Sequence, residues 1–166
     1  MPFSFCHTNA KSNGILNPMF LEPTSFMKEA LSEAKKAFEE GEVPVGAVVV
    51  KNGRVIARGH NCRQKEHDIS GHAEIVALKA AGKALRTWAL DGCQLYVTLE
   101  PCLMCAGAII QSRVSTLVYG ASDPQFGAIN SSHHVFDDAE TLVSKGEMEQ
   151  ECKALLDEFF AKKRQK

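Results

Sequence analysis

The hydrophobic and polar positions of the N-terminal third first follow a helical period. From a cap candidate at Thr24 or Ser25, apolar residues recur three or four positions apart over residues 26–38. Gly41 stands where such a helix would stop, because glycine readily adopts the left-handed backbone that ends a helix. Residues 1–23 show no clear period, so we expect a loose extension there and a single domain over residues 24–166.

The pattern then changes to strands. The apolar run at residues 45–50 predicts a buried strand, Asn52-Gly53 predicts a tight hairpin turn, and residues 54–59 predict the return strand. A polar loop over residues 61–71 follows. Further along the chain, the pattern predicts helices at residues 72–83, 101–111 and 147–163, and strands at residues 93–99, 115–119 and 141–143.

This succession of elements predicts the fold class. Strands that alternate with helices imply a layered α/β domain with a five-stranded sheet, largely parallel after the first hairpin. No segment is apolar for long enough to cross a bilayer, so we expect no membrane contact. The first residues do not resemble a secretory signal, and we therefore expect a cytoplasmic protein.

The net charge of the chain limits the kinds of partner that the whole molecule can attract. The chain has 19 Lys and Arg against 20 Asp and Glu, a formal net charge of -1. It is therefore not a polycation, and any contact with nucleic acid must come from a local basic patch. Candidates are Arg58, Arg63, Lys65, Lys79, Lys83, Arg86 and the C-terminal Lys162-Lys163-Arg164.

Two short motifs carry the candidate chemistry: His72-Ala73-Glu74 and Pro101-Cys102-Leu103-Met104-Cys105. Imidazole nitrogen and thiolate sulfur are preferred zinc ligands, and a catalytic zinc uses three protein ligands plus water. His72, Cys102 and Cys105 supply three, which predicts one Zn²⁺ per chain. Since the two cysteines are three positions apart near a helix start, they share one face, and the helix dipole favours their thiolates.

Glu74 has a different predicted role. Zinc lowers the pKa of a bound water toward about 7, and a nearby carboxylate can take its proton and pass it on. A closed structural zinc site is the alternative, but it would need a fourth ligand, and none of the other histidines has diagnostic spacing. An H-x-E motif joined to P-C-x-x-C is the signature of zinc-dependent nucleobase deaminases.

From about Phe26 onward the chain resembles the bacterial tRNA-specific adenosine deaminases, within the zinc-dependent cytidine/deoxycytidylate deaminase superfamily. The matching stretches are EVPVGAVVV (42–50), GHN (59–61), GHAEI (71–75), LYVTLEPCLMCAGAII (95–110), SRV (112–114), YGASD (119–123) and ALLDEFF (154–160). The resemblance implies a cytidine-deaminase-like three-layer α/β/α sandwich with a mixed sheet. It also implies a homodimer that converts the wobble adenosine of a tRNA anticodon stem-loop to inosine.

The resemblance also implies roles for residues outside the two motifs. Asn61 would read the base, the backbone N–H of Ala73 would face it, Val45 would line the base pocket, and Asp123 would lie near the nucleotide. Each position has a plainer explanation: Val45 as strand core, Asp123 as a cap or turn former before Pro124, and Asn61 as a turn residue. Both explanations stay open at this stage.

One departure from the family pattern affects these expectations. Residues 124–140 look shorter than and different from the usual segment, so the RNA contacts there are not implied. His133-His134 in that segment we interpret as solvated or RNA-facing rather than as a second metal site. Elsewhere, we expect Trp88 to pack in the core.

Two other functions remain as alternatives. A deaminase of a free nucleobase or mononucleotide, such as guanine, cytosine or deoxycytidylate, would share both motifs. Single-domain cytidine deaminases usually carry cysteine at the position that resembles His72, so His72 argues against that class. Riboflavin-pathway deaminases have a wider cysteine spacing than Cys102-x-x-Cys105, which argues against those enzymes. A zinc-stabilised RNA-binding module without catalysis would have no use for Glu74 beside the metal.

Overall fold

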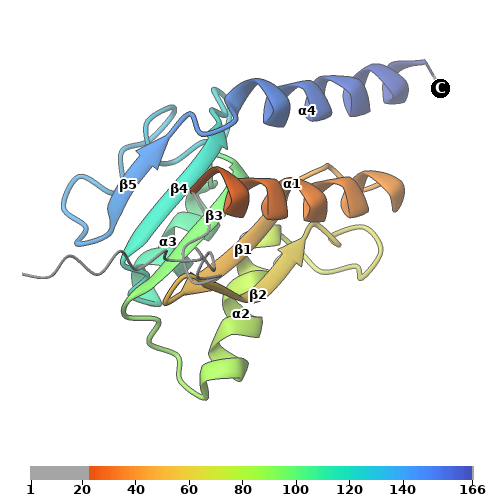
Figure 1. Cartoon of the computed structure of the whole chain (residues 1–166). Coiled ribbons are helices and arrows are strands. Elements are labelled where there is room, and N and C mark those ends of the chain that lie inside the picture. The colour runs from red at the N-terminus through yellow and green to blue at the C-terminus, as the bar shows by residue number, and fades with distance from the viewer. Residues whose placement is uncertain (1–22, 166) are drawn as a thin grey trace, which may run out of the picture.

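The computed structural model describes residues 23–165, which form four helices and five strands (Figure 1). The predicted elements are all present, with ends that differ by a few residues. In chain order they are α1 (Pro23–Glu39), β1 (Gly46–Lys51), β2 (Arg54–His60), α2 (Ala73–Leu85), β3 (Cys93–Leu99), α3 (Leu103–Gln111), β4 (Thr116–Ala121), β5 (Leu142–Lys145) and α4 (Glu149–Arg164).

The five strands form one mixed sheet in the order β2-β1-β3-β4-β5. β1 pairs antiparallel with β2 through the Asn52-Gly53 turn, and antiparallel with β3 on its other side. β3, β4 and β5 run parallel, each reached through a crossover. Positive φ angles at Asn52 (50°) and Gly53 (71°) are those of the tight turn that the sequence predicts. The expected mixed sheet is therefore confirmed.

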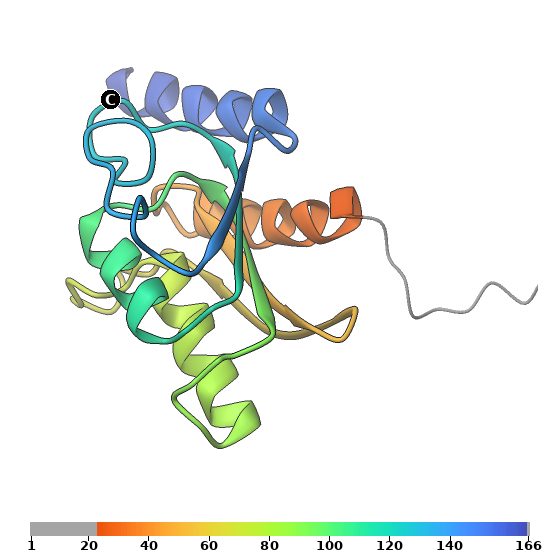
Figure 2. The ribbon, with the colours of Figure 1, turned by 90° about the vertical axis from the view of Figure 1, so that its left-hand side faces the viewer.

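Helices cover both faces of the sheet, which gives the expected three layers (Figure 2). One core lies between the sheet and the side that carries α2 and α3, and includes Val49, Ala77 and Ile109. The other lies between the sheet and α1 with α4, and includes Met27 and Cys152. β1 and β3 contribute to both cores because their successive side chains point to opposite faces. No helix of the described residues is long and apolar enough to span a membrane.

Two glycines let helix backbones approach the hairpin closely. A Cβ on Gly59 of β2 would collide with the carbonyl of Ala73 and the amide of Ala77 in α2. A Cβ on Gly46 of β1 would collide in the same way with the backbone of α1 at Ala30 and Ala34. The start of α2 is therefore held directly against the end of β2, which fixes the position of His72.

The structure corrects three expectations. α1 begins at Pro23, so Thr24 and Ser25 lie within the helix and not at its N-cap. Pro101 does not start a helix: α3 begins at Leu103, and Cys102 is its N-cap in an extended conformation, with φ −74° and ψ 173°. Trp88 is not core, since 67% of its surface is exposed. It follows the left-handed Arg86 that ends α2, so it lies in a surface turn, where its ring faces the guanidinium of Arg113 at 5.1 Å. Of the expected extension over residues 1–23, only Pro23 is described, as the first residue of α1, and residues 1–22 lie outside the described residues.

Candidate metal centre and active site

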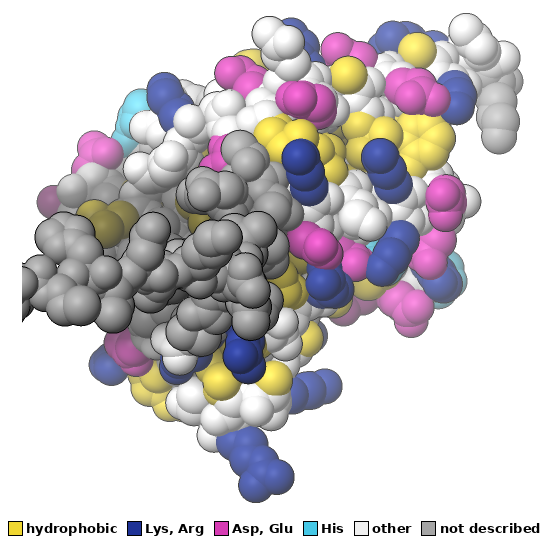
Figure 3. Space-filling view, viewed as in Figure 1, with side chains coloured by type: hydrophobic (Ala, Val, Ile, Leu, Met, Phe, Trp, Pro, Cys, Tyr) yellow, Lys and Arg dark blue, Asp and Glu magenta, His cyan; other side chains and the backbone are white. Residues whose placement is uncertain are grey.

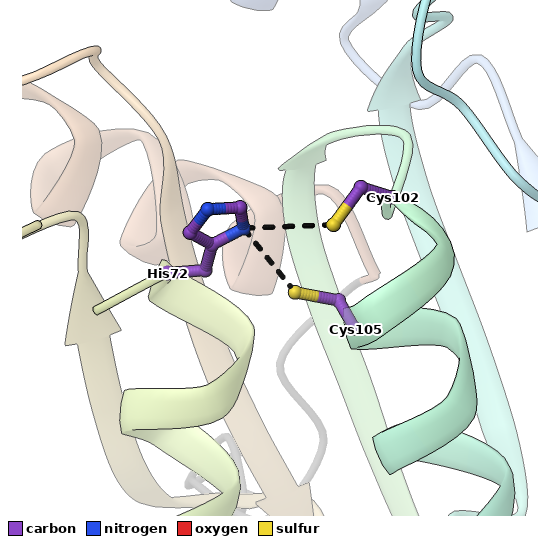
Figure 4. Close-up of side chains that lie close together, drawn as sticks. All are labelled: His72, Cys102 and Cys105. Atoms are coloured by element: carbon purple, nitrogen blue, oxygen red, sulfur yellow. Dashed lines mark hydrogen bonds between the residues drawn. The ribbon is translucent and has the colours of Figure 1, made fainter. Parts of the chain in front are cut away.

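His72, Cys102 and Cys105 converge from two helix starts that are 30 residues apart in the chain (Figure 4). The Nδ1 atom of His72 lies 3.6 Å from the Cys102 sulfur and 3.5 Å from the Cys105 sulfur. One ligand atom from each residue lies within 4.8 Å of the other two. The structure thus brings together the three residues that the sequence proposes as metal ligands.

Local backbone structure explains this convergence. His72 is the N-cap of α2, and Cys102 is the N-cap of α3, while Cys105 lies in the first turn of α3. Neither cap position has its own side chain hydrogen-bonded to the helix end, so the imidazole and the thiol are free to face each other. Two helix N-termini therefore point their partial positive charge toward one place, which favours anionic sulfur.

Hydrogen bonding within the cluster favours thiolate at Cys102. The hydrogen bond from the Cys105 thiol, opposed by burial but supported by His72, lowers the pKa of Cys102 to about 3. The same hydrogen bond, together with burial, raises the pKa of Cys105, so the pair holds one thiolate readily. A divalent cation held by these residues would favour the second thiolate as well, because a coordinating thiol is deprotonated.

The donor set fits a soft or borderline metal with an open coordination position. One imidazole nitrogen and two sulfurs are ligands that suit zinc. Among the described residues, no fourth His, Cys, Asp or Glu joins the three. This argues for an open site of the catalytic kind rather than a closed structural one.

Glu74 lies beside this cluster and is 4% exposed. Burial raises the pKa of its carboxyl to about 7, in spite of opposing contributions from backbone hydrogen bonding and from His72. A group with a pKa near neutral can both accept and donate a proton during turnover. Glu74 is therefore suited to proton transfer.

A cavity of about 710 Å³ opens onto the cluster. Pockets of ~300–1,000 Å³ typically bind small molecules or parts of larger ones. Its lining contains six of the eight proposed site residues and further residues that the sequence did not single out. The lining residues are Glu42, Val43, Val45, Asn61, Arg63, Gln64, His72, Glu74, Leu99, Glu100, Cys102, Asp123 and Phe126.

Val45 and Asn61 form one wall of this cavity. The Asn61 N–H donates to the Val45 carbonyl at 3.1 Å, and the Asn61 side-chain oxygen accepts from the Ala73 N–H at 3.0 Å. Asn61 thus holds the first turn of α2, while its side-chain amide nitrogen is the group left to meet a ligand. Val45 is 5% exposed and belongs to the core on the α2 and α3 side, so the strand-core explanation also describes it.

Asp123 lies on the cavity wall and caps a turn at the same time. Its carboxylate accepts from the backbone N–H groups of Gln125 at 3.0 Å and Phe126 at 3.1 Å. The turn-former explanation therefore describes its contacts, and its place on the cavity wall keeps it within the candidate site.

Comparison with known proteins identifies the family. A family model described as MafB19-like deaminase matches residues 22–164. The chain belongs to this deaminase family.

The similarity to tRNA-specific adenosine deaminases is confirmed over most of the chain. The tRNA-specific adenosine deaminase of Bacillus subtilis is 48% identical over 85% of this chain and 90% of its own length. A solved tRNA:A34 deaminase, from work on A-to-I editing at the wobble position of transfer RNA, is 45% identical, with TM-score 0.77 over 80% of this chain and 99% of that one. The guanine deaminase of Nitrosomonas europaea has the same TM-score, 0.77, over 94% and 100%, but only 27% identity.

Two buried carboxylates of this deaminase are not singled out by any pattern in its sequence. Glu42 is 2% exposed and accepts from the backbone N–H groups of Gln64 and Lys65, both at 2.8 Å. Glu100, also 2% exposed, accepts from backbone groups of the loop after β4. The only signal for Glu100 was a charged residue directly after an apolar strand, and the loop groups it binds are 23 to 31 residues further along.

Substitution of Asn61 should separate its two hydrogen-bonding roles. Asn61→Asp keeps the oxygen that accepts from Ala73 but removes the amide donor, so we expect deamination to fall about 10-fold to 100-fold while metal content stays at the wild-type level. Asn61→Ala also loses the support of α2 and should further lower the free energy of unfolding by about 1 kcal/mol. Initial rates, metal analysis and urea unfolding measure the three quantities. Wild-type activity in Asn61→Asp would contradict a base contact by the amide.

Proposed function

We propose that this deaminase converts the wobble adenosine of a tRNA anticodon loop to inosine by hydrolysis. The observation that carries the proposal is the meeting of His72, Cys102 and Cys105 with a buried Glu74 at one cavity. Adenosine and water would give inosine and ammonia. In this proposal one Zn²⁺ per chain is held by His72, Cys102 and Cys105, and Glu74 moves protons.

The chain's residues would divide the work as follows. Bound zinc would supply Lewis-acid activation of water at neutral pH. Glu74 would take one proton from the attacking water and pass it to the purine ring nitrogen next to C6, and would then carry the second proton of that water to the departing amino group. Its pKa of about 7 suits both directions of transfer.

The remaining site residues would bind and orient the base. The Ala73 N–H donates to the Asn61 side-chain oxygen, so the Asn61 amide nitrogen is the group that would meet the polar edge of the base, and Val45 would pack against its face. Asp123 would lie near the nucleotide, and burial of the base in the cavity would exclude bulk water. These assignments rest on the shared cavity wall and on the hydrogen bonds of Asn61.

Sequence identity favours RNA over a free base as substrate. The chain is 48% identical to the Bacillus subtilis tRNA-specific adenosine deaminase, against 27% for the Nitrosomonas europaea guanine deaminase. Guanine deamination remains the second candidate because that enzyme covers 94% of this chain at an equal TM-score.

The test uses a stem-loop RNA that carries adenosine both at the wobble position and in the paired stem. We expect inosine at the loop position only, because extracting a paired base costs a few kcal/mol. Inosine is read as A-to-G changes after reverse transcription. Equal conversion at both positions, or none at either, would refute the proposal.

Charge on the described surface is mixed, and several of its basic residues are paired with carboxylates. On the face formed by α1 and α4, Lys and Arg side chains lie among Asp and Glu side chains (Figure 3). Arg58 pairs with Glu29 at 2.5 Å, and Lys65 pairs with Glu40 at 3.2 Å. Arg63 is the basic residue on the cavity wall.

Arg63 and Arg58 offer a matched pair for testing phosphate contact. We expect Arg63→Gln to weaken tRNA binding and to reduce the slope of log affinity against log salt by about 0.7 to 0.9, the value of one phosphate contact. Arg58→Gln should leave the slope unchanged because its charge already faces Glu29. Affinities measured over a series of salt concentrations give both slopes. Equal slopes in all three proteins would contradict a phosphate contact by Arg63.

We also propose that the protein is a cytoplasmic homodimer. Support for the dimer comes from exposed apolar side chains on the α2 and α3 side: Trp88 is 67%, Leu103 54% and Met104 39% exposed. The five described cysteines are free thiols, which suits a reducing compartment. Light scattering should give about twice the chain mass of 18.1 kDa. A fully active monomer at micromolar concentration would contradict the dimer.

A further inference from the structure

Phe126 is a large apolar side chain with no role in the mechanism above. It is 61% exposed and lies on the wall of the cavity that contains His72 and Glu74. A single exposed aromatic residue is ordinary on a protein surface. Phe126 differs from such a residue because the backbone of the loop that carries it is held in place.

The backbone around Phe126 is fixed on both sides. On one side, the Asp123 carboxylate accepts from the N–H of Phe126 itself. On the other, Gly127 forms a β-bridge with Cys102, and the Ala128 N–H donates to the Pro101 carbonyl at 2.9 Å. The loop is therefore joined to the segment that carries a proposed metal ligand.

Glu100 anchors the same loop from inside. Its carboxylate accepts from the backbone N–H groups of Asp123 (3.0 Å), Ile129 (3.1 Å), Asn130 (2.7 Å) and Ser131 (3.0 Å), and from the Ser131 hydroxyl. Burial alone would raise the pKa of Glu100, but these hydrogen bonds outweigh it and lower the pKa, so the group is a carboxylate.

Gly127 shows how tightly the loop is packed onto this carboxylate. A Cβ at position 127 would collide with the carboxyl group of Glu100. The residue next to Phe126 therefore has to be glycine for the loop to close over Glu100. The ring is presented by a backbone that is already ordered, so little entropy remains to be lost when a ligand meets it.

We propose that Phe126 is a stacking surface for a nucleobase next to the reacting base in single-stranded RNA, and that Glu100 is the positioning residue that holds it there. The proposal deepens the proposed function and rests on it. Aromatic side chains at fixed positions bind unstacked bases of single-stranded RNA through the faces of the rings. The cavity of about 710 Å³ is in the range that accommodates ligands larger than one base.

The first experiment measures kcat and KM on an anticodon stem-loop for the full chain and three variants. We expect Phe126→Ala to lower kcat/KM about 10-fold, mostly through KM, since stacking on one base is worth about that factor. Phe126→Tyr keeps a stacking ring and should stay within about twofold of wild type. Leu142→Ala is the matched control: it also removes an exposed apolar side chain (71%), but from the edge strand β5, and should change nothing.

The second experiment changes the RNA. The nucleotides on either side of the target are replaced, one at a time, by abasic residues. At one of these positions the loss should be about 10-fold for the wild type but under about twofold for Phe126→Ala, because the variant no longer has the contact to lose. Equal losses in both enzymes at both positions would overturn the proposal, as would an unchanged KM in Phe126→Ala. Absence of inosine with wild type and intact RNA would instead refute the proposed function itself.

The role of Glu100 is tested by combining Glu100→Gln with Phe126→Ala in a double-mutant cycle on the same stem-loop. Glu100→Gln should raise KM for the stem-loop while the metal content stays at the wild-type level, and it should have little further effect once Phe126 is alanine. Fully additive losses of Glu100→Gln and Phe126→Ala would show that Glu100 does not act through Phe126.

Discussion

Replacing Glu74 by alanine or glutamine is expected to reduce deamination by about 10³-fold or more while the metal content stays near one ion per chain. Proton transfer by a positioned side chain contributes about 10²- to 10⁴-fold. Here one carboxyl would serve the water, the ring and the leaving group in turn. Glutamine has almost the same shape but cannot move a proton, so the loss should be nearly as large in Glu74→Gln as in Glu74→Ala.

Metal analysis and single-turnover rates on the same samples distinguish a proton shuttle from a ligand. Glu74 is not among the three groups whose ligand atoms lie within 4.8 Å of one another. Its removal should therefore leave His72, Cys102 and Cys105 in place. If Glu74→Gln lost metal as readily as a cysteine variant does, the assignment of Glu74 as a non-ligand would be wrong.

Cys102→Ala is expected to abolish both metal binding and activity. With one of three ligands removed, affinity should fall by more than about 100-fold, since loss of a supporting residue around a metal ligand already costs 10- to 100-fold. A bound metal stabilises the folded state by mass action, so the wild type should also lose thermal stability when a chelator is added. Cys102→Ala should be insensitive to the chelator.

Cys93→Ala provides the matched control for this experiment. Cys93 is a buried free thiol in β3, outside the cluster. Its replacement should lower the free energy of unfolding modestly but leave metal content and the response to chelator unchanged. Chelator sensitivity in Cys102→Ala equal to that of Cys93→Ala would contradict the proposed ligand set.

The sequence was sufficient for most of the fold because each element has a local signal. The Asn52-Gly53 turn and the apolar run before it identify the hairpin, and the helical spacing of apolar residues identifies α1. The start of α3 was less well predicted, since proline is compatible with a first helical turn. Here Pro101 belongs to the segment before the helix, where its carbonyl accepts from Ala128.

Trp88 shows a different limit of prediction from hydrophobic spacing. A large aromatic residue is usually buried, but Arg86 ends α2 in a left-handed conformation and turns the chain outward. The tryptophan is left on the surface against Arg113. Such a turn depends on backbone conformation at one residue, which hydrophobic spacing does not encode.

The candidate site also contains both residues that the sequence could predict and residues that it could not. His72, Cys102 and Cys105 form short motifs with chemistry that residue type and spacing alone suggest. Glu100 and Phe126 gain their proposed roles only from contacts made across the fold by residues 123–131. No local signal could have connected Glu100 to backbone groups that lie 23 to 31 residues away.

We expect the cluster of His72, Cys102, Cys105 and Glu74 to act on adenosine in RNA and not on a free base. The most direct test gives the purified enzyme an anticodon stem-loop with wobble adenosine and, in parallel, guanine, adenine, cytosine and cytidine, and measures initial rates of product formation. We expect inosine in the stem-loop and negligible turnover of the small molecules. Rapid deamination of guanine or cytosine with no inosine in the RNA would contradict it.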